Sequence, residues 1–78
     1  MYFVYVIESL SHKTLYVGST KNVEHRIAEH NKGKQRYTKG RRPWSLKYVE
    51  TYQTRSEAIQ RERFFKTSRG RRFLQTML

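Results

Sequence analysis

The chain has 78 residues and a formal net charge of +11 at pH 7, because 17 lysines and arginines face only six acidic residues, all glutamate. This length suits one small domain over residues 1–78, with a single modest core. The absence of cysteine excludes disulfides and thiolate zinc sites, and agrees with a reducing, cytoplasmic setting. Such a charge favours a polyanionic partner. Nucleic acid is the better candidate, and an anionic membrane surface is the next. No stretch forms an amphipathic helix long enough for membrane-surface binding, so we expect no membrane partner.

Residues 2–7 and 14–19 predict a β-hairpin. The first run is β-branched and aromatic and is apolar on both alternating faces, as in a strand covered on both sides. It is too short for a signal-peptide core or a membrane span. The polar residues 9–13 suit the connecting loop. Gly18, within the return strand, indicates a bulge or a place where another group approaches the backbone closely.

A helix is predicted from Asn22, which can cap it, to about Lys32. Val23 and Ile27 are spaced to face the core, and Gly33 suits the residue that ends the helix.

Residues 34–43 form an expected loop that is rich in lysine and arginine. Such a loop can be merely solubilising. The aromatic rings of Tyr37 within it and Trp44 just beyond it favour contact with nucleic acid instead. The residues that we expect to bind nucleic acid are Lys34, Arg36, Tyr37, Lys39, Arg41, Arg42 and Trp44.

Residues 44–52 predict a third strand, and residues 54–69 predict a helix that opens with a capping box from Thr54 to Glu57. After a break near Gly70, a short amphipathic tail follows. Its inward residues are expected to be Phe73, Leu74, Met77 and Leu78. The order is β-β-α-β-α-α. Because a short hairpin joins antiparallel strands, the expected fold class is α+β, with a small three-stranded antiparallel sheet flanked by helices.

Glu62 falls in the middle of the apolar stripe that Ala58, Ile59 and Phe65 form on the second predicted helix. A carboxylate on the packed side of a helix is costly unless it is compensated. An arginine partner and a metal ion are the two candidates, and the helix by itself does not decide between them. Since the chain has no aspartate, a two-metal site is hard to build, whereas a one-metal site needs only one glutamate.

Five side chains can converge from four predicted elements. Arg26 and His30 are four residues apart on one helix face, and the hairpin brings Tyr5 and Tyr16 together. Glu62 completes the set. These groups suit phosphodiester cleavage, because arginine can hold the phosphate, a carboxylate can hold a divalent metal, and a base must activate water. A tyrosine is a poor base unless neighbours lower its pKa, and each residue taken singly is more often a packing or surface residue. His12 and His25 are expected on the surface.

The ordered set of motifs resembles the GIY-YIG nuclease family. The residues that carry the resemblance are Val4-Tyr5-Val6, Tyr16-Val17-Gly18, Arg26, His30-Asn31, Gly33, Arg41-Arg42-Pro43-Trp44, Glu57-Ala58 and Arg61-Glu62. The glycine of the first triplet is replaced here. The chain is most similar to the compact single-domain YhbQ-like group, and its residues 40–44 also resemble the nuclease domain of Slx-type structure-specific endonucleases.

The resemblance implies a magnesium- or manganese-dependent endonuclease that cuts DNA and leaves a 5′-phosphate and a 3′-hydroxyl. It implies that Tyr5 activates water beside Tyr16 and that Arg26 holds the phosphate. It also implies that His30 assists proton transfer and that Glu62 is the single metal ligand. Many members carry an asparagine a dozen or so residues after that glutamate. Here none follows, and Gln75 is the nearest substitute. Target choice would come from the basic loop or from a protein partner. The alternative reading is a catalytically weak nucleic-acid-binding module.

Overall fold

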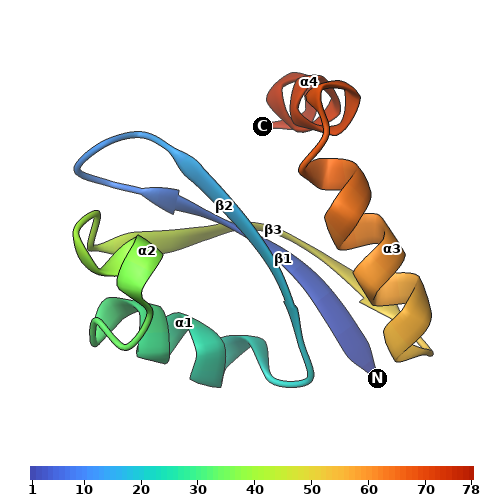
Figure 1. The fold of residues 1–78 in the computed structure, drawn as a ribbon, viewed down its shortest axis with the longest axis horizontal. Helices are drawn as coiled ribbons and strands as arrows, with labels where there is room; N and C mark the ends of the chain where they lie inside the picture. Colours follow the sequence, from blue (N-terminus) through green and yellow to red (C-terminus); the bar gives the residue numbers. More distant parts are fainter.

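The computed structural model describes all 78 residues and shows an α+β domain built on a three-stranded antiparallel sheet in the order β2-β1-β3 (Figure 1). The elements are β1 (Tyr2–Ser9), β2 (Leu15–Thr20), α1 (Val23–Asn31), α2 (Arg36–Lys39), β3 (Trp44–Tyr52), α3 (Arg55–Phe65) and α4 (Ser68–Met77). The expected fold class is confirmed, with the short helix α2 added inside the segment that was expected to be a loop. No helix of the chain has the length and apolar character needed to cross a membrane.

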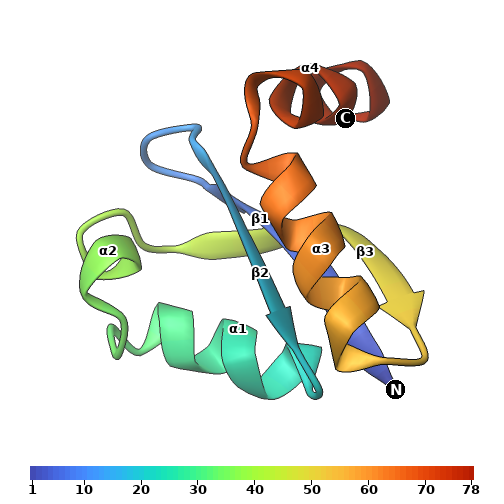
Figure 2. The ribbon, with the colours of Figure 1, turned by 45° about the vertical axis from the view of Figure 1, so that its right-hand side comes forward.

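The central strand β1 is covered on both faces, as its apolar sequence predicts. Helices α1 and α2 lie on one face of the sheet, and α3 and α4 lie on the other (Figures 1 and 2). On the α3 face, Val4 and Val6 pack with a cluster that is completed by Val17, Ala58, Phe65 and Leu74. On the α1 face, Tyr5 and Ile7 pack with Trp44, Val23 and Ile27. The candidate catalytic tyrosine Tyr5 is therefore part of the second core cluster.

The boundary between the last two helices differs from the expected one. Helix α3 ends at Phe65, and the Thr67 side chain accepts a hydrogen bond from the Gly70 backbone N–H, which caps α4. Gly70 thus lies inside α4. A Cβ atom there would clash with the Phe64 carbonyl group, so the missing side chain lets α4 pack tightly against the end of α3.

The expectation that the tail turns four apolar residues inward is right for Leu74, partly right for Phe73, and wrong for Met77 and Leu78. Leu74 is fully buried, whereas Phe73, Met77 and Leu78 are 38%, 45% and 51% exposed. The Phe73 ring still stacks on the buried Phe65 ring, with centroids 6.1 Å apart, so α4 packs Leu74 and part of Phe73 inward and leaves Met77 and Leu78 at the surface.

Trp44 also differs from expectation, because it is only 4% exposed and packs in the core beneath α2. Its indole N–H donates to the Thr38 carbonyl at 2.9 Å, and its backbone N–H donates to the Asn31 side chain at 2.7 Å. The ring is thus engaged in holding α1 and α2 to the start of β3, and it presents no surface on which a base could stack.

Candidate active site

Tyr5 lies at the centre of β1, where its register partners are Gly18 on β2 and Val49 on β3. A Cβ atom added to Gly18 would clash with the Tyr5 hydroxyl oxygen and lie 2.6 Å from Cζ of the ring, so the phenol lies directly across the glycine. The close approach that was predicted for Gly18 is confirmed, and the approaching group is Tyr5. This contact fixes where the Tyr5 hydroxyl sits.

A chain of buried hydrogen bonds runs from Tyr5 through His30 to Thr38. The Tyr5 hydroxyl is 2.9 Å from Nε2 of His30, and Nδ1 of His30 is 2.8 Å from the Thr38 hydroxyl oxygen. The Thr38 hydroxyl can donate to the Gln35 carbonyl oxygen, 3.5 Å away, and its oxygen can then accept from His30. We assign the proton of His30 to Nδ1 on this basis, so that Nε2 accepts from Tyr5.

Burial controls the ionisation of both residues. It raises the pKa of Tyr5 above its ordinary value of 10.0; Tyr16 and Glu62 add to the rise, and Arg26 opposes it. Burial lowers the pKa of His30 below 6.5, and Arg26 lowers it further while Glu29 raises it. Arg26 lowers the pKa of Tyr5, as a neighbouring cation should, but burial outweighs its effect. Tyr5 is a neutral phenol, and its hydrogen-bond partner is a neutral imidazole that can take a proton.

Tyr16 lies on β2 opposite Ile7 and is the more accessible of the two tyrosines. Its ring centroid is 5.0 Å from that of His30 and 5.8 Å from that of Tyr37. The Lys66 ammonium lies 5.8 Å from the same ring, on the side of α3. Tyr16 therefore links the buried hydrogen-bond chain to the surface.

Arg26 is positioned on α1, which Asn22 caps by accepting from the His25 backbone N–H. The Arg26 side chain is 34% exposed, and its closest carboxylate contact is a long one, 4.0 Å to Glu29. Arg26 lies one helical turn before His30 on α1, and its charge acts on both Tyr5 and His30. It remains accessible to an anionic ligand.

Glu62 reaches the site from α3, on the other face of the sheet. Its carboxylate accepts from the Ser19 hydroxyl at 2.7 Å and from the Lys66 ammonium at 2.9 Å. The alternative of a buried Glu62–arginine pair is wrong, because the neighbouring Arg61 instead makes a bidentate pair with Glu50. That Glu50 also accepts from Tyr48 and Tyr52, both at 2.6 Å. The network ties α3 to β3 and so sets the direction in which Glu62 points.

The donor set suits one metal ion and not two. The structure contains no cluster of three or more histidine, cysteine or acidic side chains. The Glu62 side chain is 23% exposed and offers a single carboxylate. Mg²⁺ typically takes one or two protein carboxylates and completes its shell with water and substrate phosphate. Glu62 fits that pattern once the Lys66 ammonium moves away from its carboxylate.

The structure therefore places the five predicted residues in two neighbouring groups. Tyr5, Tyr16, Arg26 and His30 gather on the α1 face, and Glu62 approaches around the edge strand β2. Ser19 and Lys66 contact Glu62 and were not predicted, although Lys66 is one helical turn from Glu62 and could have been found by spacing. Thr38 left no signal in the sequence, because its contact with His30 depends on how α2 packs. Gln75, the nearest substitute for the missing asparagine, lines a groove together with Tyr16 and Lys66.

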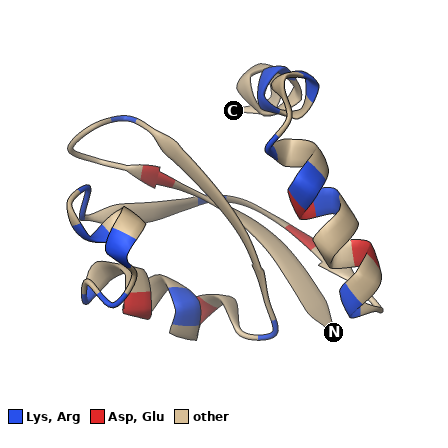
Figure 3. Ribbon diagram, viewed as in Figure 1, with Lys and Arg blue, Asp and Glu red and all other residues tan.

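The basic segment around α2 lies beside this site. Tyr37 is 58% exposed, and the Arg41 guanidinium lies 5.3 Å from its ring centroid. The other expected binding residues of the segment are at least partly exposed, namely Lys34, Arg36, Lys39 and Arg42. Figure 3 shows lysine and arginine on all four helices. Only Arg26, Lys47, Arg61 and Lys66 pair with a glutamate, so most of the positive charge is free to meet an anionic partner. His12 and His25 are exposed, as expected.

Comparison with known proteins identifies the family of the chain and agrees with its fold. Residues 1–75 match the sequence profile of the GIY-YIG catalytic domain. A UPF0213 protein of Staphylococcus epidermidis is 48% identical over 67 residues, which cover 85% of this chain and 80% of that protein. A UPF0213 protein of Halobacterium salinarum is 48% identical over 63 residues, or 80% of each chain. The solution NMR structure of a UPF0213 protein from Bacillus halodurans is 31% identical, covers 99% of this chain and 85% of that one, and superposes with a TM-score of 0.60. The chain therefore belongs to the GIY-YIG family.

Proposed function

We propose that the protein is a divalent-metal-dependent endonuclease that hydrolyses phosphodiester bonds in DNA by a one-metal mechanism. The observation that carries the proposal is the buried Tyr5–His30–Thr38 hydrogen-bond chain, which ends beside an accessible arginine and the Glu62 carboxylate at the edge of β2. In this chain a neutral phenol donates to a neutral imidazole that can take a further proton. The Tyr5–His30 hydrogen bond is therefore suited to the transfer of a proton from the phenol to the imidazole.

Each residue has a distinct task in this proposal. Arg26 binds the phosphate with two N–H groups and stabilises the charge that develops on it. The attacking water gives its proton to the Tyr5 oxygen as the Tyr5 hydroxyl proton passes to Nε2 of His30. The raised pKa of Tyr5 does not block this step, because the lasting proton acceptor is His30. Tyr16, at the surface, positions the phosphate.

Glu62 would hold Mg²⁺ or Mn²⁺, which when bound supplies positive charge at the phosphate and at the leaving oxygen. The Ser19 hydroxyl steadies one oxygen of Glu62, and Lys66 keeps the carboxylate neutralised until it is displaced. The bond cleaved is P–O3′, and the leaving 3′-oxygen takes a proton from solvent, which gives a 5′-phosphate and a 3′-hydroxyl.

The test is cleavage of a panel of labelled single-stranded, duplex and branched DNA and of RNA, with magnesium, with manganese and with a chelator. We expect metal-dependent cutting by the wild-type protein and none by Glu62→Gln, which should still fold and bind DNA. Loss of folding in Glu62→Gln would indicate a structural carboxylate and count against the proposal.

A second candidate is a nucleic-acid-binding module of little or no activity, which is favoured by the Lys66–Glu62 pair that occupies the proposed metal ligand. The two are separated by binding DNA without metal and then adding magnesium or manganese. An enzyme cuts the bound DNA in one turnover that needs Glu62. A complex that stays intact with every substrate supports the binding module.

A further inference from the structure

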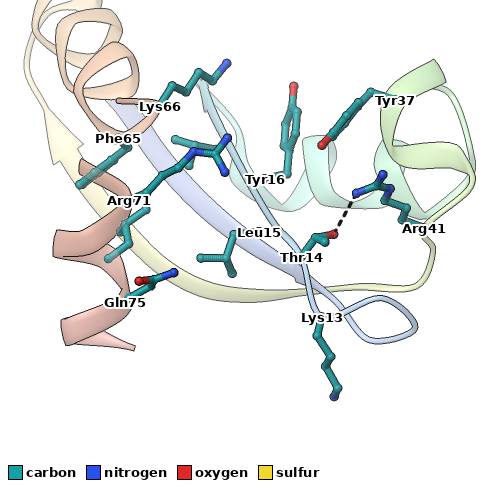
Figure 4. A pocket seen from close by; sticks show the side chains of 12 residues that line it. Lys13, Thr14, Leu15, Tyr16, Tyr37, Arg41, Phe65, Lys66, Arg71 and Gln75 are labelled. Atoms are coloured by element: carbon teal, nitrogen blue, oxygen red, sulfur yellow. Dashed lines mark hydrogen bonds between the residues drawn. The ribbon is translucent and has the colours of Figure 1, made fainter. Parts of the chain in front are cut away.

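A groove of about 560 Å³ crosses the edge strand β2, between α2 on one side and the end of α3 with α4 on the other (Figure 4). None of its 12 lining residues is acidic, whereas its charged residues are Lys13, Arg41, Lys66 and Arg71. Its volume is within the range of sites that hold small organic molecules. The groove is therefore large enough for a ligand, and all of its charged side chains are positive.

Arg71 is the cation best placed to use this space. In Figure 4 its guanidinium extends from α4 toward Tyr16, whereas Lys13 points away from the groove. The Arg71 side chain forms no ion pair with any glutamate of the chain and no hydrogen bond. A planar guanidinium that faces an open groove without a carboxylate partner is suited to bind phosphate with two parallel hydrogen bonds.

The facing wall adds a second guanidinium. Arg41 makes one long hydrogen bond, 3.5 Å to the Thr14 hydroxyl, and covers the exposed ring of Tyr37. Its remaining N–H groups are unsatisfied by the protein. The groove thus carries an arginine on each wall, contributed by segments that lie far apart in the sequence.

The groove is continuous with the candidate active site. Tyr16 and Lys66 line it, and the same two side chains contact His30 and Glu62 respectively. The groove therefore offers one path for a polynucleotide whose phosphate lies at Tyr16.

We propose that this groove binds the phosphodiester backbone next to the cleaved bond, and that Arg71 is its main phosphate contact on the α4 side. The location of the cleaved bond rests on the proposed function, but the binding of the backbone does not. Arg71 was not among the residues that the sequence assigned to nucleic-acid binding.

Arg72 supplies a matched control, because it is the next residue of α4, is also exposed and does not line the groove. We would measure the affinity of Arg71→Gln and Arg72→Gln for fluorescein-labelled DNA by anisotropy, in chelator, over a series of salt concentrations. Loss of one phosphate contact should reduce the log–log salt slope by about 0.9 on duplex or about 0.7 on a single strand. We expect that reduction and weaker binding for Arg71→Gln, and a clearly smaller change for Arg72→Gln. Thermal unfolding of the two variants should match the wild type.

Equal losses in the two variants, or wild-type binding by Arg71→Gln, would overturn the proposal. Because this measurement uses no metal and no cleavage, its failure is distinct from failure of the proposed function. If Arg71→Gln binds normally and Glu62→Gln abolishes cutting, the groove assignment falls and the nuclease stands. If Arg71→Gln binds weakly and nothing cuts DNA, the groove stands and the nuclease falls.

Discussion

The hydroxyl of Tyr5 lies 2.9 Å from Nε2 of His30, and the two side chains are 2% and 0% exposed. Polar groups at this depth are held in place by their partners, since water cannot take over their hydrogen bonds. His30 is satisfied on its other nitrogen by Thr38, and no buried side-chain polar atom of the protein lacks a partner. The pair is thus held in place by the protein's own hydrogen bonds before any substrate binds.

Removal of the Tyr5 hydroxyl tests the role of this pair. Tyr5→Phe keeps the ring and its packing but leaves Nε2 of His30 without a donor, so the free energy of unfolding should fall by about 1 kcal/mol. Cleavage should collapse, because water loses its proton acceptor. The measurements are denaturant unfolding and single-turnover cleavage. Tyr16→Phe is the matched comparison. If Tyr5→Phe cuts DNA normally and Tyr16→Phe is inactive, the proton acceptor is the more accessible Tyr16 and not Tyr5.

The lowered pKa of His30 predicts how stability depends on pH. Its folded-state pKa lies below the unfolded value near 6.5, so the unfolded chain binds the extra proton more readily. The contribution of His30 to stability is therefore complete above about pH 6.5 and is lost as the pH falls toward the lowered pKa. The charged side chains nearest to it are Arg26 and Glu29. Unfolding measured between about pH 5 and 8 should show this loss in the wild type and less of it in His30→Gln. His12→Gln, which changes an exposed histidine, should retain it.

The proton acceptor must also be neutral for catalysis. We expect the acid limb of the cleavage profile to lie below pH 6.5, since burial and Arg26 both keep His30 unprotonated. Arg26→Ala removes one of these causes, so the limb should move upward while the rate falls about 10²- to 10³-fold. An acid limb that does not move would mean that His30 is not the group that titrates.

The elements that could be predicted from the sequence are those fixed by local pattern. The β-branched run of β1, the capping box at Thr54 and the Asn22 cap all depend on neighbouring residues, and all are present. Gly70 looked like a helix breaker because glycine usually is one. Its actual role depends on contact with the Phe64 carbonyl in the preceding helix. Trp44 next to several cations looked like a stacking surface, and its burial depends on the Thr38 carbonyl that α2 supplies.

In the candidate site, too, some features follow from local sequence pattern and others depend on packing between elements. Arg26 and His30 follow from helical spacing, and Tyr5 and Tyr16 follow from the hairpin. The Tyr5–His30–Thr38 order could not be predicted, because it joins three elements through side-chain packing. The resemblance to the family proposed the residues, and the structure added the hydrogen-bond partners of Tyr5 and His30.

Lys66 is expected to compete with a metal ion for Glu62. Its ammonium lies 2.9 Å from Oε2, in a pair whose side chains are 48% and 23% exposed. Pairs of this exposure contribute about 0.2–1 kcal/mol, so Lys66→Met should raise the affinity for Mn²⁺ by about 1.5- to 5-fold. Calorimetric titration of the DNA-free protein with Mn²⁺ provides the measurement. Lys47→Met, which breaks the separate pair with Glu8, is the control and should change nothing. Unchanged or weaker binding in Lys66→Met would mean that Glu62 is not the metal ligand or that Lys66 helps to hold it in place.

Gly18 offers the sharpest test of how the Tyr5 hydroxyl is positioned. In Gly18→Ala the added methyl group would clash with that oxygen and lie 2.6 Å from Cζ, so Tyr5 must shift away from its place above β2. Inserting a methyl group into a packed contact of this kind costs about 1–3 kcal/mol of stability, and the Tyr5–His30 hydrogen bond should lengthen. Gly40→Ala is the matched control, because no atom lies within 4 Å of the position that its methyl group would take and no backbone strain applies there. We expect Gly40→Ala to fold and cut DNA like the wild type. We expect Gly18→Ala to lose most of its activity at temperatures where circular dichroism shows it still folded. Full activity in a folded Gly18→Ala would show that the position of the Tyr5 hydroxyl is not critical, which would remove the hydrogen-bond chain from the mechanism.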